Sequence, residues 1–210
     1  MPAAMASASI IEEADPAAIA AWLAARLAGA LAATPGEIAI AIPGGSTPFP
    51  ILAALAGHGL DWPRLAVWPT DDRLVAEHHP ASNLGRIRAA LAPLGARVVA
   101  LDAASRPPHF ALVWLGMGED GHIASLFPAS DPRPGDSLPV RQLTPDPLPP
   151  EAPFARLSLT MPALLDSDEL LFVMRGEAKR ALFAAAMRGG NDLPVARLLA
   201  AARQPVTCFT

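Results

Sequence analysis

The chain has 210 residues, of which 52% are hydrophobic and 17% charged, and its formal net charge is −4. This length allows a substantial core in one large domain or two small ones. An acidic chain without a basic patch is not expected to bind nucleic acid. Glu12, Glu13 and Asp15 precede the first apolar segment, which is not the pattern of a signal peptide. No apolar run is expected to be long enough to span a bilayer, so we predict a cytoplasmic protein without a membrane partner.

Two residues are the single representatives of their type. Cys208 is the one cysteine, which excludes an internal disulfide, and its apolar surroundings predict a buried thiol. Lys179 is the one lysine among 16 basic residues. Because arginine serves almost everywhere else, Lys179 is a candidate functional residue, the alternative being a solvated helix position.

The N-terminal part of the chain predicts a helix, a buried strand and a glycine-rich turn. Asp15-Pro16 is typical of an N-cap and first helical residue, and apolar residues follow at helical spacing up to Gly36. Residues 38–42 predict a strand that runs into Pro43-Gly44-Gly45-Ser46-Thr47-Pro48 and a helix to about residue 56. Glycines, hydroxyls and a helix N-terminus are typical of a phosphate-binding turn. The alternative is an ordinary strand–helix turn capped by Thr47.

Polar residues follow the next predicted strand, residues 65–68. Asp71-Asp72-Arg73 suits a rim that binds anions and hydroxyls, the alternative being a solvated loop with an internal ion pair. Glu77-His78-His79 predicts a solvated loop and not a metal site, because adjacent histidines rarely point at one ion. Ser82-Asn83 begins a predicted helix through residue 91, with Asn83 either capping it or reaching the site.

The segment 110–128 is the most informative part of the chain. A predicted strand, residues 110–115, ends in the turn Gly116-Met117-Gly118-Glu119-Asp120-Gly121, and His122 follows. A short helix is expected after this turn, closed by Pro128. The glycine spacing also fits a dinucleotide-binding motif, but that motif needs a long helix and a second buried strand, which the proline-rich residues 128–134 cannot supply.

Strands and helices continue to alternate in the rest of the chain. Strands are predicted at residues 97–101, 156–160, 170–174 and 206–209, and helices from Pro162, from 176 to about 187 and from 194 to 202. A proline-rich loop over residues 132–153 is expected to be extended, as a rim or lid. This alternation predicts one domain over residues 1–210, an α/β fold with a single doubly wound, mostly parallel Rossmann-like sheet and helices on both faces.

An ordered set of segments resembles the 6-phosphogluconolactonase family, within the broader group that includes glucosamine-6-phosphate deaminases. Pro43–Pro48 resembles the glycine-rich phosphate loop of the family, and Asp71-Asp72-Arg73 its Asp-Glu-Arg motif, with Asp72 in place of the glutamate. Ser82-Asn83 matches the Ser-Asn that follows. Residues 116–128 resemble the family signature nearly residue for residue, and Gly176-Glu177-Ala178-Lys179 resembles a Gly-x-x-Lys near the end.

The resemblance implies hydrolysis of 6-phospho-D-glucono-1,5-lactone in the pentose phosphate pathway. His122 would be the general base that activates water, with Asp120 orienting its ring or capping the turn. Backbone N–H groups of the turn are expected to meet the developing oxyanion. Neither a metal nor an organic cofactor is implied, and a monomer or weak homodimer is expected. The residues expected to bind the substrate and its phosphate are Gly44, Gly45, Ser46, Thr47, Asp71, Arg73, Asn83, Gly118, Arg156 and Lys179.

Two other functions stay open at this point. One is an amino-sugar-phosphate deaminase/isomerase on the same scaffold, although residues 124–128 resemble the lactonase ending of the signature. The other is a non-catalytic sugar-phosphate-binding protein. It is motivated by the short segment before the central strand and the short C-terminus.

Overall fold

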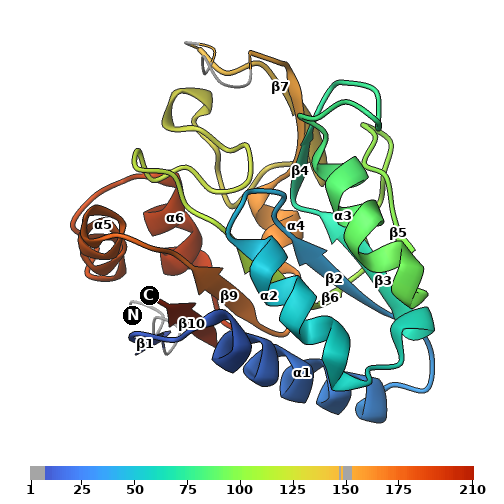
Figure 1. Cartoon of the computed structure of the whole chain (residues 1–210). Helices are drawn as coiled ribbons and strands as arrows, with labels where there is room; N and C mark the ends of the chain where they lie inside the picture. Colours follow the sequence, from blue (N-terminus) through green and yellow to red (C-terminus); the bar gives the residue numbers. More distant parts are fainter. Residues whose placement is uncertain (1–7, 147, 149–152) are drawn as a thin grey trace.

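The computed structural model describes residues 8–146, 148 and 153–210. Its main sheet has seven strands in the order β1-β10-β9-β6-β2-β3-β5, and every neighbouring pair is parallel (Figure 1). The strands are β1 (Ala8–Ile11), β2 (Ile38–Ile42), β3 (Leu65–Pro69), β5 (Arg97–Val98), β6 (Phe110–Leu115), β9 (Leu170–Val173) and β10 (Val206–Phe209). The predicted parallel sheet is confirmed. β1 was not predicted, and β5 is shorter than the strand expected at residues 97–101.

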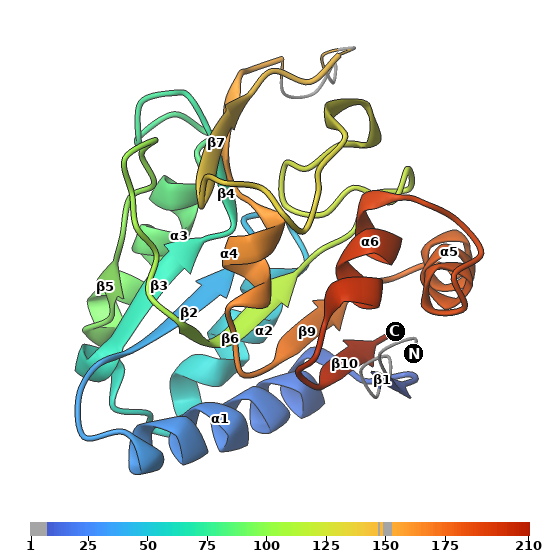
Figure 2. The same ribbon diagram turned by 180° about the vertical axis from the view of Figure 1, so that it is seen from behind.

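Helices cover both faces of this sheet, as a doubly wound fold requires (Figures 1 and 2). One face carries α1 (Pro16–Ala33), α2 (Pro48–Leu55) and α3 (Asn83–Leu91), and the other carries α4 (Met161–Leu165), α5 (Glu177–Met187) and α6 (Pro194–Ala201). Successive strand residues enter opposite core layers because side chains alternate across a strand. Short 3₁₀ turns lie at Ala56–His58, Trp62–Arg64, Ala92–Leu94 and Pro128–Ser130.

The N-terminal helix begins as its sequence predicts. The Asp15 carboxylate accepts a hydrogen bond of 2.7 Å from the Ala18 N–H, and Pro16 is the first residue of α1. By length and composition alone α1 is apolar enough to cross a bilayer, with a mean hydropathy of 1.5. The expectation that no apolar run reaches this length was therefore wrong. One such helix is weak evidence for a membrane span because a core helix passes the same test, and α1 packs one face, including Ile19, Leu23 and Leu27, into the core.

A second, smaller sheet lies beyond the carboxyl edge of the first (Figure 1). It consists of β4 (Asp71–Arg73), β8 (Arg156–Leu159) and β7 (Val140–Leu143), all antiparallel. The sequence predicted one sheet only: it gave residues 71–73 as a rim and residues 140–143 as part of the proline-rich loop, and it placed the strand at 156–160 in the main sheet. Pairing between segments so distant along the chain leaves no local signal, which explains the omission. Residues 147 and 149–152 of that loop lie outside the described residues.

The single cysteine lies in β10 and is fully buried. Burial raises the pKa of the Cys208 thiol to about 12. The predicted buried thiol is confirmed, and such a thiol is a small core residue with little nucleophilic thiolate.

Candidate active site

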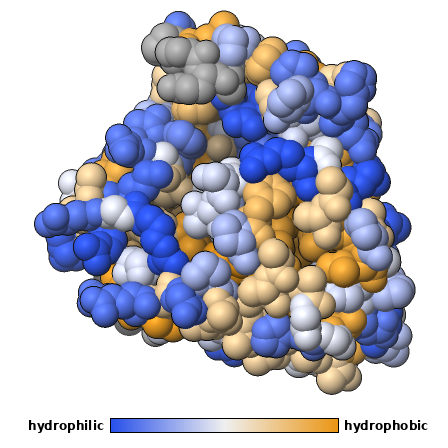
Figure 3. Space-filling model, viewed as in Figure 1, coloured by the Kyte–Doolittle hydropathy of each residue, from blue (hydrophilic) through white to orange (hydrophobic). Residues whose placement is uncertain are grey.

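A cavity of about 350 Å³ opens where the turns after β2, β6 and β9 face the small sheet. The space-filling view shows hydrophilic side chains gathered around a hollow near the middle of this face (Figure 3). Except for Asp120, every residue expected at the site lines the cavity. These residues are Gly44, Gly45, Ser46, Thr47, Asp71, Arg73, Asn83, Gly118, His122, Arg156 and Lys179.

The segment after Gly121 is an irregular loop, so the predicted short helix is wrong. Gly121 and Ala124 have φ angles of 78° and 50°, which take the backbone out of the right-handed helical region. Instead the loop folds back on itself, with antiparallel bridges from Ile123 to Met117 and to Leu126. The long helix that a dinucleotide-binding motif requires is absent from residues 121–130, which are all described.

Asp120 contacts the His122 ring although it does not itself line the cavity. One carboxylate oxygen, Oδ1, lies 2.6 Å from His122 Nδ1 and also accepts from the His122 backbone N–H at 3.2 Å. Asp120 therefore orients the ring and caps the turn, which are the two roles that the sequence left open. The Phe127 ring packs on the imidazole with a centroid separation of 4.5 Å. His122 Nε2 is the ring nitrogen that Asp120 leaves for other partners.

Three N–H groups of this turn already donate within the loop. Gly118 N–H donates to the His122 carbonyl at 2.9 Å, Gly121 N–H to the Gly118 carbonyl at 3.1 Å, and His122 N–H to Asp120. The expectation that the turn itself supplies oxyanion donors is therefore wrong for these three groups.

The loop is anchored on two sides by buried polar contacts. Ser125 is fully buried; its N–H donates to Ser158 Oγ at 3.2 Å, and its hydroxyl donates to the Asp71 carboxylate at 2.5 Å. On the opposite side, the Val195 N–H at the start of α6 donates to the Gly121 carbonyl at 3.1 Å. His122 is thus carried by a loop fixed between the small sheet and α6.

The Asp71-Asp72-Arg73 strand and the start of α3 form one hydrogen-bonded corner of the site. Arg73 Nη1 donates to Asn83 Oδ1 at 2.6 Å, and Asn83 Nδ2 donates to the Asp71 carbonyl at 2.9 Å. Ser82 Oγ accepts from Gly85 N–H at 3.0 Å and caps α3. Of the two roles considered for Asn83, the structure therefore shows the one that reaches the site.

Asp72 faces the start of α3 and not the cavity. Its carboxylate accepts from the backbone N–H groups of Asn83 at 2.6 Å and Leu84 at 3.2 Å. Burial raises the pKa of Asp72, and these hydrogen bonds oppose the rise. At this position the carboxylate braces the helix that supplies Asn83.

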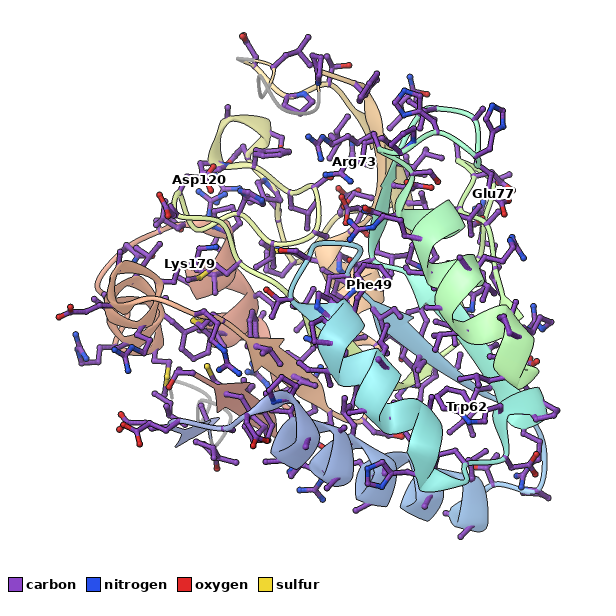
Figure 4. The ribbon with its side chains drawn as sticks, in the orientation of Figure 1. Phe49, Trp62, Arg73, Glu77, Asp120 and Lys179 are labelled. Atoms are coloured by element: carbon purple, nitrogen blue, oxygen red, sulfur yellow. The ribbon has the colours of Figure 1, made fainter. Side chains whose placement is uncertain are left out.

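Several cations reach the cavity from different elements. Arg73 lines it from β4 and Lys179 from α5, and both are labelled in Figure 4. Burial lowers the pKa of Arg156, with Arg73 acting in the same direction and Asp71 opposing it. Thr47 makes no side-chain hydrogen bond that caps α2, so the alternative of a strand–helix turn capped by the Thr47 hydroxyl is wrong. The site therefore concentrates positive charge in an acidic protein.

Some lining residues had no functional signal in the sequence. The cavity has an apolar part, which is lined by Trp114, Met117, Val173 and Met174. The sequence indicated only strand or core positions for these four residues. Arg175 also lines the cavity, while its Nη2 donates to the Ala14 carbonyl at 2.6 Å. Its place between the predicted strand 170–174 and Gly176 was the signal that could have identified it.

The Glu77-His78-His79 segment lies on the solvent-exposed side of α3. Glu77 pairs with Arg88 at 2.5 Å, and both histidines are exposed. Across the described ranges, no three His, Cys, Asp or Glu side chains are grouped as a metal site would require.

Comparisons with known proteins identify the family and the fold of this chain. A family model described as glucosamine-6-phosphate isomerases/6-phosphogluconolactonase matches residues 12–106 and 94–207. The 6-phosphogluconolactonase of Pseudomonas putida is 36% identical over 208 residues, covering 89% of this chain and 84% of that protein. That of Caulobacter vibrioides is 34% identical over 188 residues, covering 78% and 79%. The solved 6-phosphogluconolactonase of Shewanella baltica has the same fold, with a TM-score of 0.83 at 23% identity, over 98% of this chain and 99% of that one. The chain therefore belongs to the glucosamine-6-phosphate isomerase/6-phosphogluconolactonase family.

Proposed function

We propose that this protein hydrolyses 6-phospho-D-glucono-1,5-lactone to 6-phosphogluconate, a step of the pentose phosphate pathway. The observation that carries the proposal is one cavity lined both by His122, whose ring Asp120 orients, and by a set of cations and hydroxyls. A phosphorylated lactone needs the imidazole for reaction at its ring carbonyl, and it needs the cations and hydroxyls to bind its phosphate. The names of the relatives support this substrate.

In this reaction His122 is the general base. Because Nδ1 lies 2.6 Å from Asp120 Oδ1, we assign the ring proton of the resting imidazole to Nδ1, which leaves Nε2 as the proton acceptor. Nε2 takes a proton from a water whose oxygen adds to the lactone carbonyl carbon. The ring C–O bond then breaks, and the imidazolium returns the proton to the departing alkoxide. Asp120 stabilises the positive charge that the ring carries between the two steps.

The phosphate occupies the end of the cavity formed by the glycine-rich turn. Ser46 and Thr47 donate through their hydroxyls and Lys179 through its ammonium, a charge-assisted hydrogen bond. Arg73 adds a second cation, and Asp71 and Asn83 bind sugar hydroxyls. The charge of Arg156 stabilises the oxyanion, because the N–H groups of Gly118, Gly121 and His122 already donate within their own loop.

The test is the hydrolysis of 6-phosphogluconolactone by the purified protein, corrected for spontaneous ring opening. His122→Gln should lower kcat by about two to four orders of magnitude with an unchanged circular dichroism spectrum. His78→Gln, a change at an exposed histidine outside the cavity, is the matched control and should leave kcat unchanged. A folded His122→Gln variant with wild-type kcat would remove His122 from the mechanism.

The same preparation separates the other two functions. Release of ammonia from glucosamine 6-phosphate would identify a deaminase. Binding of 6-phosphogluconate without turnover of either substrate would identify a sugar-phosphate-binding protein. A cytoplasmic location and a monomer or weak homodimer complete the proposal, and size-exclusion chromatography tests the latter.

A further inference from the structure

Arg86 contacts the glycine-rich turn from outside the cavity. Its Nη1 donates to the Gly44 carbonyl at 2.7 Å, and its guanidinium lies over the Phe49 ring, 4.2 Å from the centroid. Phe49 belongs to the first turn of α2 and faces the space between α2 and α3 (Figure 4). One side chain of α3 therefore ties together the turn and the helix that follows it.

This contact decides which way the next peptide group points. In a planar trans peptide the C=O and N–H bonds point in opposite directions. Gly44 and Gly45 line the cavity, whereas Arg86 does not. With the Gly44 carbonyl held toward Arg86, the Gly45 N–H points away from Arg86, toward the cavity. Gly45 is exposed, and its N–H makes no hydrogen bond to the described residues.

Without a clamp, two adjacent glycines would allow this peptide to rotate. A carbonyl oxygen turned into the cavity would repel a phosphate, whereas an N–H group attracts it. The inner side of the turn is already fixed, since a Cβ on Gly44 would lie 2.1 Å from Asn83 Cγ. Asn83 and Arg86 are three residues apart on α3 and so share one helix face. Asn83 packs against the turn from the cavity side and Arg86 holds its carbonyl from the other.

We propose that Arg86 is a positioning residue, which holds the glycine-rich turn so that the Gly45 N–H donates to the phosphate of the substrate. The inference rests on the proposed function and assigns a role to a residue outside the cavity. Arg86 acts through the turn, so its loss weakens phosphate binding and leaves the chemistry at His122 intact.

The experiment compares Arg86→Met, Arg86→Lys and the matched control Arg88→Met. Arg88 lies on the same helix but bonds to Glu77 and the Val98 carbonyl, away from the turn. Arg86→Met should raise KM for 6-phosphogluconolactone about tenfold, with little change in kcat and none in KM for unphosphorylated glucono-1,5-lactone. Arg86→Lys should recover part of this loss, because an ammonium still donates but lacks the planar group that stacks on Phe49. Arg88→Met should match the wild type on both substrates.

Calorimetric titration with 6-phosphogluconate separates this inference from the proposed function. Weaker binding in Arg86→Met, with Arg88→Met unchanged, supports the inference even if the wild type shows no lactonase activity. Equal affinities of Arg86→Met and wild type overturn it, as does an equal rise of KM for both lactones. If Arg86→Met does not fold, Phe49→Leu serves instead, since it removes the stacking surface and should raise KM for the phosphorylated lactone alone. An unchanged KM in that folded variant also overturns the inference.

Discussion

Gly118 gives the sharpest test of how His122 is positioned. A Cβ at this position would lie 2.2 Å from both Cε1 and Nδ1 of the His122 ring and 2.6 Å from Asp120 Oδ1. Non-bonded carbon atoms pack at about 3.5–4.0 Å. The imidazole must therefore retreat by roughly 1 Å or more, and it can do so by rotating its side chain while the backbone stays in place.

Gly118→Ala is expected to be a folded enzyme with a displaced base. A displacement of about 1 Å at the reacting group can cost on the order of a hundredfold in rate, so we expect kcat to fall by about that factor. KM for the phosphorylated lactone should change little because the phosphate end is untouched. Gly116→Ala is the control in the same loop, since no atom lies within 4 Å of its added Cβ, and it should keep wild-type kcat.

The assay is lactone hydrolysis with background subtraction, with Tm measured for each variant. A second comparison isolates the cause: in a His122→Ala background, Gly118→Ala should cost almost nothing further, because the ring that it displaces is gone. A kcat within about threefold of wild type in folded Gly118→Ala would show that the ring position does not limit the reaction. A further large loss in the His122→Ala background would show that the methyl group acts elsewhere.

Three other changes test separate parts of the molecule. Lys179→Ala should raise KM for the phosphorylated lactone about ten- to a hundredfold but not that for glucono-1,5-lactone; equal values for wild type and variant would place the ammonium away from the phosphate. Ser125→Ala should lower the free energy of unfolding by about 1–3 kcal/mol, since buried Asp71 loses a donor, and an unchanged urea midpoint would contradict this. Hydrogen bonds to Asp166 and a second aspartate raise the pKa of His109. These bonds therefore stabilise the folded state fully at a pH below the pKa that His109 has in the unfolded chain. The stabilisation is lost as pH rises through the pKa of His109 in the folded protein. His109→Gln should lower Tm at about pH 5 and not at about pH 9, by the equivalent of under 1 kcal/mol for so exposed a group; an equal loss at both pH values would argue against the charge.

Much of the main sheet was predictable because its signals are local. Runs of β-branched and aliphatic residues such as 38–42 predicted buried strands, and Asp15, Pro48 and Pro194 marked helix starts through capping and the fixed φ of proline. Parallel strands put their carboxyl ends on one edge, so turns far apart in sequence were expected to converge. The cavity brings together the candidate residues named from those turns.

The helix expected after Gly121 shows where local reasoning failed. Residues 122–127 are apolar enough to suggest a helix, but contacts with other parts of the chain determine the shape of the loop. Ser125 bonds to Asp71 and Ser158, and the Gly121 carbonyl accepts from the start of α6. These contacts hold Ala124 at a positive φ that its own side chain does not favour. The sequence of this segment alone does not indicate these partners.

The sequence by itself determined the doubly wound sheet, the edge on which the chemistry lies and the residue types that carry it, because periodicity, capping and strand direction are properties of neighbouring residues. Only the tertiary structure decided the small antiparallel sheet, the turning of Asp72 toward α3 and of Asn83 toward Arg73, and the hold of Arg86 on Gly44. Each of these depends on a hydrogen bond between groups that meet only after the chain has folded, and the free energy of burying an unpaired polar group enforces each pairing.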